Sequence, residues 1–192
     1  MERSIPLRKC FTNSSGGVVD SSGKIVKSAR RQTPPQGGQA LTGTIAELAL
    51  ELISEFDVSA VGVSAAGFIS SDRKTMLATP NIAGWNGVDL TDQLEKQIGR
   101  RVVLENDANS AAWGEKKFGA GRDFHTVIML TVGTGLGGGL IVNNQLYRGA
   151  YGIGAEFGHT RAVPNGHLCG CGIRGCFEQY ASGNALLRHA RE

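Results

Sequence analysis

Hydrophobic and polar residues follow regular patterns in the first half of the chain, and these patterns predict secondary structure. A polar Asp-Ser-Ser-Gly turn separates two short segments of strand character, which predicts a β-hairpin over residues 16–31. Apolar residues then repeat at helical spacing from Ile45 to Phe56. Thr44 and Glu47 form a capping-box pattern just ahead of this repeat. We therefore expect the first helix to begin at Thr44.

The pattern then alternates between strand and helix. Residues 58–67 are small and apolar, which predicts a buried strand that ends at Gly67. A weaker helix is expected at residues 90–98, a second strand at 101–107, and a short helix at 110–121 that glycine terminates. Strand–helix–strand alternation of this kind predicts an α/β fold with a parallel sheet.

From His125 onwards, the pattern changes to consecutive strands. Residues 125–132 form a strongly apolar strand, and residues 133–139 are expected to form a glycine-rich turn. A second hairpin is expected around Asn143 and Asn144, because paired asparagines suit a tight turn. The chain then enters a further helix near residue 182.

This change of pattern predicts two domains. We expect a small α/β lobe over residues 1–110 and the start of a larger lobe over residues 111–192. The second region has only three strands and one helix, so one face of its sheet would stay uncovered. The larger lobe is therefore expected to be incomplete.

Composition and charge exclude several classes of protein. The net charge of +3 is small and no stripe of Lys and Arg is interleaved with aromatic residues, so we expect no nucleic-acid partner. The apolar runs are strand-sized, so no membrane association is expected. The charged N-terminus is not followed by an apolar segment, which argues against a signal peptide. A cytoplasmic location follows, where cysteines stay reduced.

Three of the four cysteines lie within eight residues, at Cys169, Cys171 and Cys176. With His159 they form the spacing His-x9-Cys-x-Cys-x4-Cys, and three thiolates with one imidazole satisfy tetrahedral zinc. A disulfide would leave one cysteine unpaired, a redox site would usually show Cys-x-x-Cys, and chance clustering remains an alternative. The spacing favours structural zinc, which would fix the loop that carries Glu178.

Asn106 and Asp107 come directly after a predicted buried strand, where α/β proteins place their sites. A carboxylate there can accept a proton from a substrate hydroxyl, and an Asn side chain can donate and accept hydrogen bonds to hold that substrate. Alternatively, Asp107 caps the helix that begins near Ala108. The local sequence leaves both interpretations open.

Gly133, Gly135 and Gly138 have the spacing of a dinucleotide-binding fingerprint. A strand follows them, however, and no helix N-terminus is available to receive a pyrophosphate, so the dinucleotide interpretation fails. A glycine-lined turn with Thr134 can still hold phosphate through backbone N–H groups. A flexible β-turn without a ligand explains the same residues equally well.

Five segments together carry a resemblance to a known family. They read GFISSDRKTMLATPNI, VVLENDANSAAWGE, LTVGTGLGGGLIV, GAEFGHTRAVPNG and CGCGIRGCFEQYASG. The sequence resembles bacterial glucokinases of the ROK family, which combines sugar kinases and sugar-responsive repressors. The resemblance extends over about residues 16–192 and implies the actin-like ATPase fold, with hexose and ATP between two lobes.

The resemblance also implies roles for individual residues. Asp107 would take the proton from the sugar 6-hydroxyl as this hydroxyl attacks the γ-phosphate of ATP. The sugar pocket would comprise Asn106, Glu156, His159 and Glu178, with Gly67 and Asn81 lining it. The second phosphate loop, next to ATP with magnesium, would comprise Gly133, Thr134 and Gly135. His159 would also ligate zinc through one ring nitrogen and face the sugar with the other.

Two features depart from the family pattern. An Asp-x-Gly-Gly-Thr-Lys motif that binds phosphate is replaced here by LRKCFTNSS, so we expect the first strand of the sheet to be lost with it. Family chains also continue beyond the point where this one stops. We therefore expect an impaired glucose kinase. The alternatives are a sugar-binding remnant without activity and a sugar-sensing regulator without its DNA-binding module, and the resemblance allows a homo-oligomer.

Overall fold

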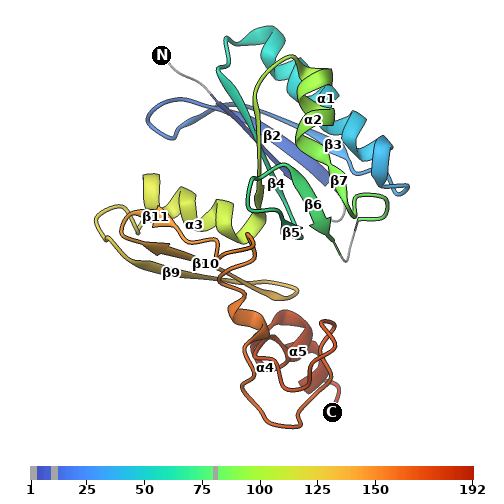
Figure 1. The fold of residues 1–192 in the computed structure, drawn as a ribbon, viewed down its shortest axis with the longest axis vertical. Coiled ribbons are helices and arrows are strands. Elements are labelled where there is room, and N and C mark those ends of the chain that lie inside the picture. Colours follow the sequence, from blue (N-terminus) through green and yellow to red (C-terminus); the bar gives the residue numbers. More distant parts are fainter. Residues whose placement is uncertain (1–3, 10–12, 80–81) are drawn as a thin grey trace. The chain divides into compact units, whose positions relative to one another are not determined.

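A five-stranded mixed sheet organises the first part of the chain (Figure 1). The computed structural model describes residues 4–9, 13–79 and 82–192. The sheet has the strand order β3-β2-β1-β4-β8. Its strands are β1 (Ser4–Lys9), β2 (Asn13–Val19), β3 (Ile25–Gln32), β4 (Ala60–Ala65) and β8 (Val102–Asn106). Strands β1, β4 and β8 run parallel, while β2 pairs antiparallel with both of its neighbours. The predicted hairpin and parallel strand pairs are therefore confirmed.

Strand β1 contradicts the expectation that the first strand is lost. It pairs antiparallel with β2 and parallel with β4, in the middle of the sheet. These pairings are made by backbone N–H and C=O groups, so they need neither the glycines nor the acidic residue of the family motif. The altered sequence therefore keeps the strand.

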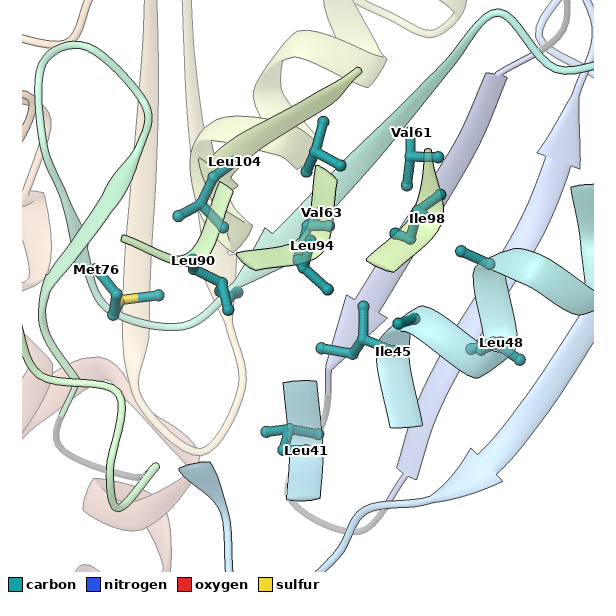
Figure 2. Packing of buried hydrophobic residues seen from close by; sticks show 14 of the residues in the cluster. Leu41, Ile45, Leu48, Val61, Val63, Met76, Leu90, Leu94, Ile98 and Leu104 are labelled. Carbon is teal, nitrogen blue, oxygen red and sulfur yellow. The ribbon is translucent and has the colours of Figure 1, made fainter. Parts of the chain in front are cut away.

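Two helices pack against this sheet and enclose its hydrophobic core. Helix α1 (Gly38–Glu55) contacts β2 and β3, and helix α2 (Leu90–Ile98) contacts β8 and α1. Figure 2 shows apolar side chains of both helices, among them Leu41, Ile45, Leu48, Leu94 and Ile98, together with Val61 and Val63 of β4. A small antiparallel sheet of β5 (Phe68–Ile69), β6 (Thr75–Ala78) and β7 (Val88–Asp89) adds Ile69 and Met76 to this core.

The start of α1 differs from the capping-box prediction. The helix begins at Gly38, and Thr44 lies inside it, where its Oγ1 donates a hydrogen bond to the Ala40 carbonyl. Gly38 N–H donates to the carbonyl of Ala83 at 2.7 Å, so a contact from a distant segment fixes the helix start. Trp85 Nε1 also donates to Gly38 O at 3.1 Å. Local sequence carries no signal of these contacts.

Helix α3 (Asp107–Phe118) follows β8 directly, and the later strands form a second sheet of order β11-β10-β9. These strands are β9 (Val127–Val132), β10 (Leu136–Val142) and β11 (Gln145–Leu146). Asn143 and Asn144 both have positive φ (50° and 62°), which confirms the hairpin turn predicted between β10 and β11. The predicted glycine turn is shorter than expected, because β10 already begins at Leu136.

The chain divides into two compact units. The first comprises Met1–Ser110 with Ala150–Ile153, and the second comprises Ala111–Gly149 with Gly154–Glu192. Residues 150–153 belong to the first unit, where a Cβ at Gly152 would lie 2.4 Å from the carbonyl oxygen of Ile69. In the second unit, the side chains of Ile128, Leu130 and Val132 of β9 are exposed. No helix in the described ranges has the length and apolar character to span a membrane.

Candidate functional site

The junction between β8 and α3 holds the first predicted site residues. Asn106 Oδ1 accepts hydrogen bonds from the backbone N–H groups of Ala108 (2.9 Å) and Asn109 (3.1 Å), so Asn106 caps the helix. Asp107 is half-buried, and its Oδ1 accepts from the Ala108 N–H at 3.0 Å. Asn106 thus accepts from two helix-start N–H groups, and Asp107 shares one of them.

Asn106 also contacts a second predicted site residue, Gly67. The Asn106 Nδ2 atom donates to the Gly67 carbonyl at 3.1 Å. Gly67 has φ +142°, and a Cβ there would lie 2.7 Å from the carbonyl oxygen of Ala78, so only glycine fits. The structure therefore brings Gly67 and Asn106 together, while Asn81 lies outside the described residues.

Sequence reasoning missed a buried carboxylate directly before this junction. Glu105 is only 9% exposed, and its Oε2 lies 3.4 Å from Nε of Arg73, in the turn between β5 and β6. An acidic residue directly after the apolar run VVL was the available signal, because an acidic side chain is rarely buried without a partner. The partner could not be identified, since Arg73 is far away in sequence.

The cysteine loop in the second unit forms a compact cluster of possible metal ligands. One ligand atom from each of His159, Cys169, Cys171 and Cys176 lies within 4.8 Å of the others. Cys169 Sγ is 3.6 Å from His159 Nδ1, and Cys171 Sγ is 3.6 Å from Cys176 Sγ. Around tetrahedral zinc, bonds of about 2.0–2.3 Å give ligand separations of about 3.5–3.8 Å. The donor set and its spacing therefore fit a zinc ion.

The same separations argue against a disulfide. An S–S bond is about 2.0 Å long, and Cys169, Cys171 and Cys176 are all free thiols. Burial, and then the neighbouring thiols, raise the pKa of Cys176 to about 12. At Cys171, burial opposes ionisation, but hydrogen bonds from the Ile173 backbone and from the other two thiols hold its pKa below the ordinary value. A bound cation would favour the thiolate form at each position.

Glycines give this loop its tight path. Gly172 and Gly175 have positive φ, and a Cβ at Gly175 would overlap the Val163 carbonyl oxygen. The Cys169 N–H donates to the Ile173 carbonyl at 2.8 Å. This hydrogen bond closes the turn that contains Cys169 and Cys171. The loop therefore brings its three thiols together by backbone geometry.

Glu178, at the start of α4 (Glu178–Ala181), connects the cysteine loop to the glycine turn. Its Oε2 accepts from the Leu136 N–H at 2.9 Å, and its Oε1 lies 3.9 Å from Cys169 Sγ. A Cβ at Gly135 would lie 2.4 Å from Glu178 Oε2. Gly135 thus makes room for this carboxylate.

Glu156 directly precedes a short 3₁₀ helix, η1 (Phe157–His159), that ends with His159 and packs on β10. The His159 N–H donates to the Glu156 carbonyl at 3.0 Å. A Cβ at Gly138 would lie 2.4 Å from the Phe157 ring. This glycine of the apparent dinucleotide fingerprint therefore serves packing.

The turn of Gly133 and Thr134 contacts the start of α5 (Gly183–His189). The Gly133 carbonyl accepts from the Gly183 N–H at 2.8 Å, and the Thr134 carbonyl accepts from the Asn184 N–H at 3.3 Å. Thr134 itself is exposed. The turn is therefore anchored by backbone hydrogen bonds, and its role in phosphate binding stays a prediction.

The predicted residues are thus distributed over both units. The first unit holds Gly67, Asn106 and Asp107, and the second holds the glycine turn, the metal cluster, Glu156 and Glu178. Within each unit, hydrogen bonds hold several of the described residues that the sequence singled out, such as Asn106 with Gly67 and Glu178 with Leu136. Their combined action on one substrate is a proposal.

Comparison with known proteins identifies relatives of this chain. A family model described as "ROK family" matches residues 10–192. The glucokinase of Streptomyces coelicolor is 47% identical over 181 residues, which cover 94% of this chain and 56% of that protein. The glucokinase of Thermotoga maritima is 43% identical over 182 residues, covering 94% of this chain and 57% of that protein.

A solved structure matches the fold. The crystal structure of a ROK family glucokinase from Streptomyces griseus in complex with glucose and AMPPNP has a TM-score of 0.87 and 47% sequence identity. The match covers 98% of this chain and 60% of that one. The chain thus spans little more than half the length of the relatives that it matches.

Proposed function

The chain belongs to the ROK family, and from this membership we propose that it acts as a sugar kinase of the glucokinase type. Its mixed α/β structure matches ROK glucokinases, which have the actin-like ATPase fold. The proposed reaction transfers the γ-phosphate of ATP to the 6-hydroxyl of glucose. The observation that carries this proposal is the position of the Asp107 carboxylate. Asp107 lies at the start of α3, directly after the parallel strand β8, and Asn106 already caps this helix.

In the first unit, Asp107 is proposed as the general base. It would accept the proton of the 6-hydroxyl as the oxygen attacks phosphorus, a contribution of about 10²–10⁴ in rate for a well-placed base. Asn106 and Gly67 would contact the hexose beside it. Their mutual hydrogen bond supports this assignment, because it holds both residues in one place before a ligand arrives.

In the second unit, Glu156, His159 and Glu178 are proposed to bind hexose hydroxyls. Sugars present several adjacent hydroxyl groups, and carboxylate oxygens and ring nitrogens accept hydrogen bonds from them. Nδ1 of His159 faces the thiol of Cys169. In this proposal, the other ring nitrogen of His159 faces the sugar.

We propose that His159, Cys169, Cys171 and Cys176 hold one structural zinc ion. Zinc would supply no chemistry to the transfer; it would fix the loop from which Glu178 projects. Elemental analysis of protein purified without chelators should find one zinc per chain. Protein that lacks metal while its thiols react freely would contradict this proposal.

On the donor side, we propose that Gly133, Thr134 and Gly135 contact the phosphates of ATP, which binds with magnesium. The segment LRKCFTNSS offers neither the acidic residue nor the glycine pair of the family's other phosphate motif. Because phosphoryl transfer depends on positioning and charge neutralisation, we expect turnover well below that of other sugar kinases. The cytoplasmic location and a homo-oligomeric state also stay predictions.

Two measurements test the proposed function. Isothermal titration should show binding of glucose and, separately, of the ATP analogue AMPPNP with magnesium. A coupled assay for glucose 6-phosphate should then show weak turnover that Asp107→Asn abolishes while glucose binding persists. If the chain binds glucose but shows neither turnover nor AMPPNP binding, a sugar-binding remnant is favoured. If it binds no glucose, both the kinase and the remnant are contradicted.

A further inference from the structure

We propose that Arg73 and Glu105 form a positioning pair that holds Asn106 and Asp107 in their working geometry. This inference rests on the proposed function for the role of Asp107. The contacts that link Arg73 to the start of α3 come from the structure alone. Neither residue touches the proposed substrate in this assignment, so both would act through their neighbours.

Glu105 is connected directly to both sides of the β8–α3 junction. Its Oε1 accepts from the backbone N–H of Asn106 at 2.9 Å and from Nδ2 of Asn109 at 3.3 Å. Asn109 is itself buried in the first turn of α3. One carboxylate oxygen therefore joins the last residue of the strand to the first turn of the helix, with Asp107 between them.

Arg73 supplies the positive charge for this carboxylate and is itself held firmly. Its Nε lies 3.4 Å from Glu105 Oε2. Its backbone N–H donates to the Ser70 carbonyl at 3.0 Å, and its carbonyl accepts from Thr91 Oγ1 at 3.0 Å. Arg73 has φ 62°, a conformation that non-glycine residues adopt only where the surroundings enforce it. The turn thus presents the guanidinium to the carboxylate.

The pair matters because a buried carboxylate without a cation is costly. Removing Arg73 would take away the guanidinium that lies 3.4 Å from Glu105 Oε2, and the carboxylate would turn toward water. This change would weaken its hydrogen bonds to Asn106 and Asn109. The direction of the Asp107 carboxylate would then shift, and a displacement of about 1 Å is enough to impair catalysis.

The first test compares two arginine variants of equal exposure. The Arg73 and Arg31 side chains are each 42% exposed, and each pairs with one glutamate, but Arg31 pairs with Glu51 of α1. We expect Arg73→Met to weaken glucose binding about tenfold, and Arg31→Met to leave it unchanged. Arg73→Lys, which keeps the charge, should recover most of the affinity.

The second test does not depend on glucose. Hydrogen exchange at the amides of Asn106, Ala108 and Asn109 should be faster in Arg73→Met than in the unmodified protein, and unchanged in Arg31→Met. The melting temperature should fall further in Arg73→Met than in Arg31→Met, because the Glu105 side chain is 12% exposed and the Glu51 side chain is 37% exposed.

The outcomes separate the two proposals. Faster exchange at these three amides with weaker glucose binding supports the positioning pair. Unchanged amide exchange in Arg73→Met overturns the positioning pair. An equal loss of glucose affinity in Arg73→Met and Arg31→Met overturns it as well. If the unmodified protein binds no glucose, the proposed function fails, and the exchange comparison alone then decides whether Arg73 holds the junction.

Discussion

At position 67, the backbone takes a conformation that residues with a side chain rarely adopt. A Cβ there would meet the Ala78 carbonyl oxygen at 2.7 Å and Met76 Sδ at 2.9 Å. We expect Gly67→Ala to lower the free energy of unfolding by about 1–3 kcal/mol, through strain at this φ and the forced shift of β6. Thermal denaturation followed by circular dichroism measures this loss.

Gly43 provides the matched control for this substitution. It lies inside α1, and a Cβ there would meet nothing within 4 Å. Gly43→Ala should therefore raise the stability by about 0.5–1 kcal/mol, as alanine favours helices. If Gly67→Ala proves as harmless as Gly43→Ala, the tight packing around Gly67 is not what holds the Asn106 contact.

Individual residues differ in how far the sequence could predict them. The four possible metal ligands were found by spacing, since the three cysteines lie on one short loop and His159 lies only ten residues before the first of them. The sequence left the role of Asp107 open, because a cap at Asn106 is distinguished only by hydrogen-bond geometry. The partner of Glu105 lies on another strand pair, so only the folded chain identifies Arg73.

At the scale of elements, the cap of α3 makes a separate prediction. Asn106→Ala removes the acceptor for two backbone N–H groups and should lower the free energy of unfolding by about 0.5–2 kcal/mol. Asn106→Asp keeps an acceptor oxygen and should recover part of this loss, although it cannot donate to the Gly67 carbonyl. Denaturant titration of both variants checks this order, and equal losses would contradict the capping role.

The glycines in and before strand β10 can be tested separately. Gly138→Ala would push a Cβ against the Phe157 ring and displace the segment that leads to His159. We expect this variant to bind zinc more weakly. Gly133→Ala meets nothing within 4 Å and should keep full zinc affinity.

Competition with a chromophoric chelator measures both zinc affinities. Equal affinities for the two variants would show that Gly138 does not position the ligand loop. A loss of AMPPNP binding in Gly133→Ala alone would support the phosphate role that is proposed for this turn.

Element boundaries were predictable where local signals fix them. Helix α2 was predicted over the residues it occupies, since the Asp89 side chain caps its start and Gly99, with φ 66°, ends it. Helix α1 begins earlier than predicted, because Gly38 is held by Ala83, far along the chain. Strand β1 was missed because the expectation followed the family's side chains, whereas its pairing uses backbone groups.

At the scale of the whole molecule, the two units differ in how they are stabilised. The main hydrophobic cluster extends from Val18 to Leu104 and lies entirely in the first unit. The second unit buries little apolar surface; its buried apolar residues in the described part of the chain are Ala112, Leu136, Ile141, Ala185 and two cysteines. The proposed zinc ion should therefore contribute most of the stability of the second unit.

This difference predicts that chelation acts on one unit. Removing the proposed zinc ion with a strong chelator should speed hydrogen exchange throughout the cysteine loop and η1, while β4 and β8 keep their protection. Hydrogen exchange followed by mass spectrometry measures the protection of each unit separately. Simultaneous loss of protection in both units would show that they unfold as one.

Strand β9, with its exposed apolar side chains, also affects how the newly synthesised chain behaves before folding is complete. From residue 126 to residue 147 the sequence carries no ionisable acid or base other than tyrosine, and among the described residues β9 is the outermost strand of its sheet. Uncharged edges of this kind attract other nascent strands and the chaperones that shield them. Yield in a cellular host should therefore depend on growth temperature and chaperone supply more than on codon usage.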